Sequence, residues 1–302
     1  MDQALQTTTS LEKSNAPESP QRGLLSQLQF PILLALLGVV FYPVYPSLAN
    51  TWLNHSDNSH GILVPFIAAY FAWSKKDELR SVPLSTSWWG FAVLVFSLGF
   101  YLLSYAGGIA VAARLMIVTS LMGLVLFCYG REIFKTLAFP LFFLFFMVPV
   151  PDTVLGIAAL PLQLFATKVS TFLIQAIGIP VFREGNMVYF AQTQLEVAEA
   201  CSGIRSIMSY TMLSVILAYM LKGSWRKRAI LVASAVPLAL FANIVRVTGT
   251  GILAHFYGDR VARGFLHEFS GLAVFAFGFV LLFSEYLLLS RQKPVDEASP
   301  SS

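Results

Sequence analysis

The sequence is poor in charged residues. Only 12% of its 302 residues are Asp, Glu, Lys or Arg, whereas 56% are apolar and the mean hydropathy is +0.69. Soluble domains carry about 25% charged residues, so this chain cannot cover its surface with polar groups in water. Long apolar stretches joined by short charged loops are instead stable in lipid. The composition therefore predicts an integral membrane protein.

Cysteine and histidine are also scarce. With only Cys128 and Cys201, the chain can build neither a disulfide scaffold nor a thiolate metal cluster. The four histidines show no spacing typical of a zinc site, so we predict no metal and no other cofactor. The net charge of +4 is modest, and we expect no nucleic-acid partner.

Apolar stretches that approach the roughly 20 residues of a spanning helix recur along the chain. The predicted spans are 28–48, 61–73, 88–105, 109–129, 136–150, 206–221, 229–251 and 269–290. The second and the fifth are short. We therefore expect an all-α polytopic membrane protein with about eight transmembrane helices.

Lysine and arginine gather in alternate loops, which fixes the expected orientation. The residues are Lys75, Lys76, Arg80, Arg131, Lys135, Lys222, Arg226, Lys227, Arg228, Arg291 and Lys293. By the positive-inside rule these loops and both termini are cytoplasmic. Residues 1–26 are expected to be a disordered cytoplasmic leader rather than a cleavable signal peptide. Residues 27–291 form the transmembrane domain, and 292–302 a cytoplasmic tail.

This orientation requires that residues 152–201 stay on the outer side. Polar residues recur at helical spacing opposite apolar ones in 153–177, namely Gln163, Thr167, Ser170, Thr171 and Gln175. The pattern favours an amphipathic helix in the outer interface, and the alternative is a ninth span. A strand, a turn at Glu184-Gly185-Asn186 and a second strand are predicted in 181–190. A polar hairpin belongs outside the hydrocarbon.

The reactive side chains fall at the outer ends of the predicted spans. Cys201 precedes a predicted helix start, where the helix dipole and the nearby Arg205 favour the thiolate. Glu196 and Glu199 act in the opposite direction, so the sign of the pKa shift stays open. A small buried cysteine without chemistry is the alternative. Cys128 lies at the opposite end of its span, too far from Cys201 for a disulfide, and is expected to serve packing.

Two further outer helix ends carry candidate partners for a thiol. Asn243 and Arg246 lie three residues apart on one helix face. Arg246 either extends to the interface or directs its guanidinium at an oxyanion or a carboxylate.

A neutral imidazole could accept the proton of a thiol nucleophile. His267 begins the last span, and Gly271 leaves room one turn later. His60 and His255 compete for this role. We find no acidic residue near the middle of a predicted span, which disfavours an ion-coupled transporter.

Three blocks in this order carry a family resemblance. They are Glu199-Ala200-Cys201-Ser202-Gly203-Ile204-Arg205-Ser206, Asn243-Ile244-Val245-Arg246 and His267-Glu268-Phe269-Ser270-Gly271. Together with Ser59-His60-Gly61 and Val148-Pro149-Val150-Pro151-Asp152, they closely resemble the exosortase/archaeosortase family over about residues 54–290. The His in the third block matches the bacterial pattern.

The resemblance implies a membrane-embedded cysteine protease or transpeptidase, sortase-like by convergence, in the cell inner membrane. Its active site would face the periplasm. It would cleave C-terminal sorting signals of the PEP-CTERM type from membrane-anchored proteins and transfer them to a lipid or glycan acceptor. Cys201 would be the nucleophile, Arg246 the transition-state stabiliser and His267 the general base. Arg205, Asn243, His60 and Glu199 are expected to support them.

Two alternatives remain at this stage. The first is a membrane acyltransferase that carries a lipid acyl group on Cys201. The second is a non-enzymatic membrane component of polysaccharide export, for which a change of Cys201 to serine would be silent.

Overall fold

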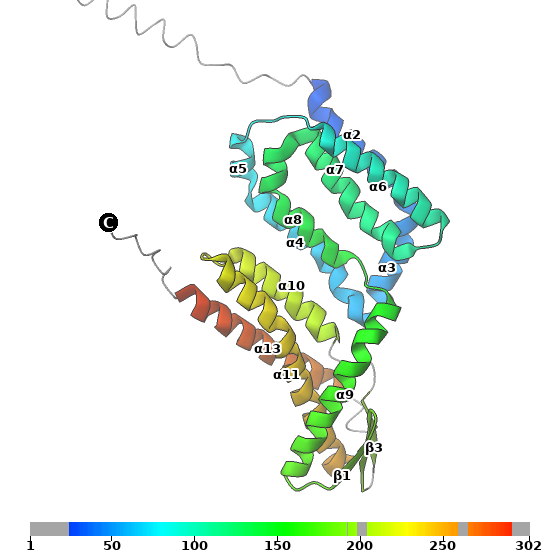
Figure 1. Cartoon of the computed structure of the whole chain (residues 1–302), viewed down its shortest axis with the longest axis vertical. Helices are drawn as coiled ribbons and strands as arrows, with labels where there is room; N and C mark the ends of the chain where they lie inside the picture. Colours follow the sequence, from blue (N-terminus) through cyan, green and yellow to red (C-terminus); the bar gives the residue numbers. More distant parts are fainter. Residues whose placement is uncertain (1–23, 192, 198–203, 259–264, 292–302) are drawn as a thin grey trace, which may run out of the picture. The chain divides into compact units, whose positions relative to one another are not determined.

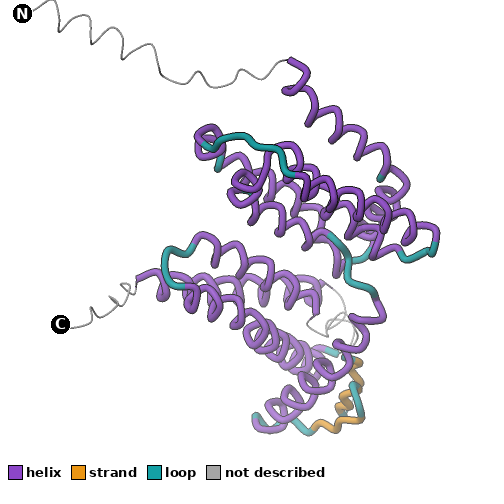
Figure 2. The backbone as a smooth tube through the Cα atoms, turned by 45° about the horizontal axis from the view of Figure 1, so that its top comes forward, coloured by secondary structure: helices purple, strands orange, loops and turns teal. Residues whose placement is uncertain are grey.

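A computed structural model describes residues 24–191, 193–197, 204–258 and 265–291 (Figure 1). The predicted leader and tail thus lie largely outside the described residues. Helices dominate the fold, and a small sheet is present (Figure 2). The chain divides into two compact units, one of Met1–Tyr45 with Lys75–Ala138 and one of Pro46–Ser74 with Phe139–Ser302.

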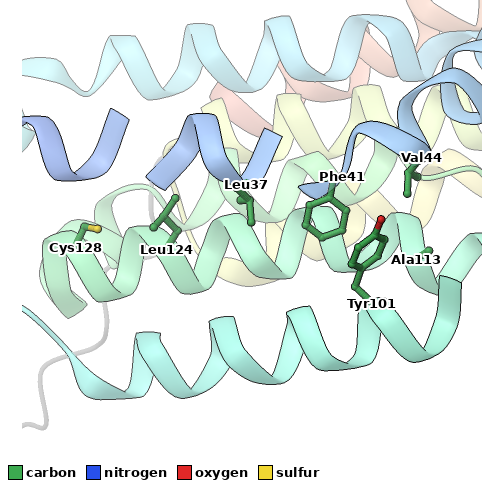
Figure 3. Packing of buried hydrophobic residues seen from close by; sticks show 7 residues of the cluster. All are labelled: Leu37, Phe41, Val44, Tyr101, Ala113, Leu124 and Cys128. Carbon is green, nitrogen blue, oxygen red and sulfur yellow. The ribbon is translucent and has the colours of Figure 1, made fainter. Parts of the chain in front are cut away.

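The first unit is built on a close pair of helices. It contains α2 (Leu24–Val40), η1 (Tyr42–Val44), α5 (Lys76–Ser81), α6 (Trp88–Ala106) and α7 (Ala110–Thr136). The backbones of α6 and α7 approach at Gly90, where an added Cβ would lie 2.2 Å from the Phe127 nitrogen. Phe41, Tyr101 and Cys128 belong to the buried cluster against α2 (Figure 3). This burial of Cys128 agrees with a packing role.

The second unit holds all the residues of the predicted site. Its elements are α3 (Tyr45–Asn54), η2 (Ser56–Ile62), α4 (Leu63–Ser74), α8 (Ala138–Phe143), η3 (Leu144–Met147), α9 (Asp152–Ala176), β1 (Val181–Glu184), β2 (Met187–Phe190), β3 (Gln194–Glu196), α10 (Ile204–Met220), α11 (Trp225–Tyr257) and α13 (Phe265–Arg291). Among these, α10, α11 and α13 lie side by side (Figure 1).

Small residues and one tyrosine set the packing of these three helices. The fully buried Tyr210 of α10 donates its hydroxyl to the carbonyls of Val274 and Phe275 on α13, at 3.3 and 3.0 Å. Gly278 has to be small there, since an added Cβ would lie 2.1 Å from the Tyr210 oxygen. The ring also packs on a buried alanine face of α11, formed by Ala235, Ala239 and Ala242.

The predicted hairpin before the Cys201 helix is confirmed, and a third strand joins it. β1 and β2 pair antiparallel around a turn in which Gly185 has a φ of +60°, a value that favours glycine. β3 pairs antiparallel with β2 and was not predicted. The sheet lies beside α9 (Figure 1), and its buried Val188 and Leu195 form a cluster with Ile174 of α9 and Val247 of α11.

The position predicted for the amphipathic helix, in the outer interface, is not confirmed. The polar stripe of α9 points into the protein, because Gln163, Thr167, Ser170 and Thr171 are all less than 7% exposed. Apolar side chains of α9, such as Ile157 and Phe172, are 73% and 68% exposed instead. This inverted arrangement suits a helix in lipid, where polar groups need partners inside the protein.

The chain is a multi-pass membrane protein, but a count of eight spans is not confirmed. Within the described residues, five helical stretches are long and apolar enough to cross a membrane, and a bent pair could add a sixth. They are Trp88–Ala106, Ala110–Thr136, Thr153–Ala176, Trp225–Tyr257 and Gly271–Arg291, with Leu28–Val40 and Tyr42–Asn54 as the bent pair. Thr153–Ala176 thus has the length and hydropathy of a membrane span, which was the alternative to an interfacial helix. The predicted spans 61–73, 136–150 and 206–221 correspond to shorter helices, with 12 residues in α4 and 17 in α10.

Candidate active site

The three-helix group α10–α11–α13 has two chemically different ends. Basic residues mark one end, where the Lys227 ammonium donates to the carbonyl of Leu289 at 3.2 Å. Arg246 follows Arg228 by eighteen positions on α11, which corresponds to about 27 Å of helix. That length is close to the hydrocarbon thickness of about 30 Å. Arg246 therefore lies about one membrane thickness away from the basic end.

Arg246 is held at the end remote from the basic residues. Its side chain is half-buried, and its Nε atom is shielded from solvent. A Cβ added to Gly271 of α13 would lie 3.6 Å from Nη2 of Arg246 and 3.7 Å from Cζ. The guanidinium thus lies against the α13 backbone at this glycine. The room that Gly271 was expected to leave is present, and the Arg246 guanidinium lies in it.

This contact brings the second and third sequence blocks together. His267 lies in the first turn of α13, four residues before Gly271, and residues at this spacing share a helix face. Asn243 is 2% exposed and lies one turn before Arg246 on α11. Cys201 and Glu199 lie outside the described residues, and α10 begins at Ile204, three positions after Cys201.

Arg205 has a partner that the sequence analysis missed. Its Nε atom lies 3.0 Å from Oδ1 of Asp57 in η2, and the two side chains are 45% and 40% exposed. Exposed ion pairs of this kind contribute about 0.2–1 kcal/mol, so the pair orients Arg205 more than it stabilises the fold. The signal in the sequence is an acidic residue, Asp57, near a predicted outer helix end. Its partner Arg205 is 148 positions away.

His60 lies in the same 3-10 helix as Asp57. Burial lowers the pKa of His60, and hydrogen bonds to the backbone of Asp57 and of Phe146 oppose this shift without cancelling it. Phe146 belongs to η3, whose Met147 carbonyl accepts a hydrogen bond from Trp52 at 2.9 Å. The His60 contact fastens η2 to η3, and the Trp52 contact fastens α3 to η3. The third histidine candidate, His255, packs instead against the rings of Phe190 and Phe256.

We expect His60 to make folding stability depend on pH. Because its pKa is lowered in the folded state, the unfolded chain binds the proton more readily. The stability that neutral His60 provides is therefore present above its unfolded pKa of about 6.5 and is lost as the pH falls below it. Thermal unfolding in detergent should show a smaller loss of Tm on acidification for His60→Gln than for wild type. The control is His255→Gln, and equal slopes for wild type and His60→Gln would contradict this prediction.

No metal site is apparent in the part of the chain that the structure describes. Among these residues, no three His, Cys, Asp or Glu side chains are grouped so that they could hold a metal ion. The described side chains of the site are instead suited to binding anionic oxygen, through Arg246, and to hydrogen bonding, through Asn243 and His60.

Comparison with known proteins gives one match. The family model described as transmembrane exosortase matches residues 52–284. No curated protein and no solved structure matches the chain significantly. The matched range includes all three sequence blocks and Ser59-His60-Gly61. The chain therefore belongs to the transmembrane exosortase family.

Proposed function

We propose that this protein is a membrane-embedded cysteine peptidase or transpeptidase that cleaves C-terminal sorting signals of exported, membrane-anchored proteins. The observation that carries the proposal is the contact of the Arg246 guanidinium with Gly271. This contact places Arg246 beside Gly271, one turn after His267 on α13. Both lie about one membrane thickness away from the basic cluster at Arg226–Arg228, and α10 begins three residues after Cys201.

The proposed reaction starts with proton transfer from the Cys201 thiol to the imidazole of His267. The thiolate attacks the carbonyl carbon of the scissile peptide, so that a C–S bond forms and the carbonyl oxygen becomes an oxyanion. Arg246 stabilises this charge, because a fixed guanidinium in a site of low polarity acts strongly on a developing anion. The C–N bond then breaks, and the imidazolium gives its proton to the departing amine.

The resulting thioester is the branch point of the reaction. Water releases a free carboxylate, whereas an amine or hydroxyl of an acceptor forms a new amide or ester and regenerates the thiol. Thioesters suit transfer, because amines compete well with water for them. We propose a lipid or glycan acceptor for this step.

The orientation belongs to the same proposal. One end of the three helices carries a cluster of basic residues, and the positive-inside rule assigns that end to the cytoplasm. The cluster consists of Lys222 after α10, Arg226, Lys227 and Arg228 of α11, and Arg291 of α13. The site then faces the periplasm across the inner membrane, with both termini in the cytoplasm. A substrate anchored by its own helix would reach the site by diffusion within the membrane.

The supporting roles follow from the described contacts. Arg205, in the first turn of α10, is engaged by Asp57 and would support the site without replacing Arg246 as the oxyanion partner. Buried Asn243 shares the helix face of Arg246 and would orient it or the substrate carbonyl. His60 would border the site from η2, and Glu199 would act near the nucleophile.

The direct test of the nucleophile uses a tagged protein with a Pro-Glu-Pro-type tail, expressed beside each variant. We expect Cys201→Ala to leave the tail unprocessed, because no thiolate remains to attack the peptide. Cys128→Ala is the matched control, since Cys128 is buried in the first unit, and it should process the tail like wild type. Immunoblotting of the tag reports both forms. Normal processing by Cys201→Ala would refute the nucleophile assignment.

A further inference from the structure

A single backbone carbonyl is held from two sides just before the nucleophile segment. Val197 follows β3, is 2% exposed and donates its N–H to the Asn186 carbonyl at 3.0 Å. The Val197 carbonyl accepts a hydrogen bond from the side-chain amide of Gln163, and the Asn186 amide approaches it at 3.4 Å. Val197 precedes Cys201 by four positions. The chain is thus anchored shortly before it reaches Cys201.

Gln163 differs from its neighbours in the polar stripe of α9. Thr167 donates its hydroxyl to the Gln163 carbonyl at 2.7 Å, and Thr171 donates to the Thr167 carbonyl at 2.8 Å, both within the helix. The amide of Gln163 reaches out of the helix to the strand segment instead. Because its side chain is only 4% exposed, this amide needs a protein partner.

α9 is in turn fastened to the helix of Arg246. The hydroxyl of Ser170 donates to the carbonyl of Ile244 at 3.2 Å, and Ile244 lies between Asn243 and Arg246. Ile174 packs against Gly251 so closely that an added Cβ would lie 2.7 Å from its Cδ1 atom. A continuous set of contacts therefore runs from Val197 through α9 to the turn that carries Arg246.

We propose that Gln163 is a positioning residue, which holds the Val197 carbonyl on α9 and thereby sets the place of the Cys201 segment relative to Arg246. This inference rests on the proposed function. The reaction requires the attacked carbonyl to be near both the thiolate and the guanidinium, and a displacement of about 1 Å can cost about 100-fold in rate. Without the amide of Gln163, the longer contact with Asn186 is the one that the Val197 carbonyl keeps among the described residues.

The kinetic test compares two variants of the protein with wild type. Gln163→Leu keeps the size of the side chain but cannot donate, and we expect kcat for tail processing to fall about 10- to 100-fold with little change in KM. Thr171→Val is the matched control, because it removes a buried hydroxyl of the same stripe that bonds only within α9. It should keep wild-type kcat. Unchanged kcat in Gln163→Leu, or an equal loss in Thr171→Val, would overturn the proposal.

Gln163→Glu separates hydrogen-bond donation from mere filling of space. A protonated carboxyl can donate to the Val197 carbonyl, whereas a carboxylate cannot. Activity of this variant relative to wild type should therefore fall as the pH rises, while Gln163→Leu stays low at every pH. A glutamate variant as inactive as the leucine variant at every pH at which wild type works would contradict the donor role.

A distance measurement makes the test independent of catalysis. In a Cys128→Ala, Arg246→Cys protein, a short bis-maleimide should link Cys201 to the new cysteine, and adding Gln163→Leu should reduce the yield. An unchanged yield would refute the positioning role even if Cys201 proved not to be the nucleophile. Conversely, a tail processed normally by Cys201→Ala would remove the proposed function but leave this cross-link result interpretable.

Discussion

Arg246→Ala should lower kcat for tail processing by about 100- to 1000-fold, the usual cost of removing one oxyanion stabiliser. The proposed oxyanion would lose its cationic partner, while the helices that hold Gly271 and Asn243 would remain. KM should change little, because the charge that Arg246 stabilises arises only in the transition state. Processing rates at saturating substrate, normalised to the amount of enzyme in the membrane, measure the effect.

Two further variants identify the role of this arginine. Arg246→Lys keeps the positive charge but loses the planar fork of donors, so it should recover only part of the rate. Arg205→Ala is the matched control. It removes an arginine whose Nε contacts the Asp57 carboxylate, and its loss should be clearly smaller. A larger loss in Arg205→Ala than in Arg246→Ala would reverse the assignment of the two arginines.

Gly271→Leu should lower kcat by about 100-fold, because its side chain would need the space that the Arg246 guanidinium occupies. An added Cβ alone would lie 3.6 Å from Nη2, which is an ordinary van der Waals distance. Gly271→Ala should therefore stay active, and alanine also favours a helix over glycine by about 1 kcal/mol. Processing rates and thermal unfolding of the two variants in detergent check both statements.

The control for this prediction is a glycine of α11 with open space around it. No atom lies within 4 Å of a Cβ added to Gly249, so Gly249→Leu adds the same bulk without displacing the guanidinium. It should retain most of the activity. Full activity in Gly271→Leu would show that the position of Arg246 against α13 is irrelevant to the reaction.

Some of these features could be predicted from the sequence because their causes are local. The hairpin follows from a glycine in a two-residue turn between alternating apolar residues, and Gly185 indeed has a positive φ. The approach of another part of the chain to Gly271 could be expected, because glycine has no side chain. That the approaching group is Arg246 could not, since this depends on how α11 and α13 pack.

The orientation of α9 could not be derived from its periodicity. The spacing of Gln163, Thr167 and Ser170 shows that the helix has two faces, but it does not show which face is covered by protein. In water the polar face would be outside, whereas in lipid the preference reverses. The polar residues of α9 make hydrogen bonds inside the protein, and its apolar residues are exposed.

Long-range partners were equally beyond sequence reasoning. Asp57 and Arg205 are 148 positions apart, and neither has a local pattern that identifies the other. The count of eight spans is not confirmed for a related reason. The short helix α4 is preceded by the 3-10 segment η2 and the short helix α8 is followed by η3, so hydropathy alone does not show where these helices begin and end. The proposal that Cys201 is the nucleophile rests on its sequence block and on the family to which the chain belongs.

If Cys201 carries the substrate as a thioester, the acylated enzyme can be trapped and identified by mass spectrometry. Enzyme and tailed substrate are mixed in membranes, denatured rapidly in acid and digested. We expect an adduct on the Cys201 peptide with the mass of the new carboxyl end of the substrate. Hydroxylamine should release this adduct, and it should be absent from His267→Ala. Processing without any adduct on Cys201, or with the adduct on another residue, would contradict it.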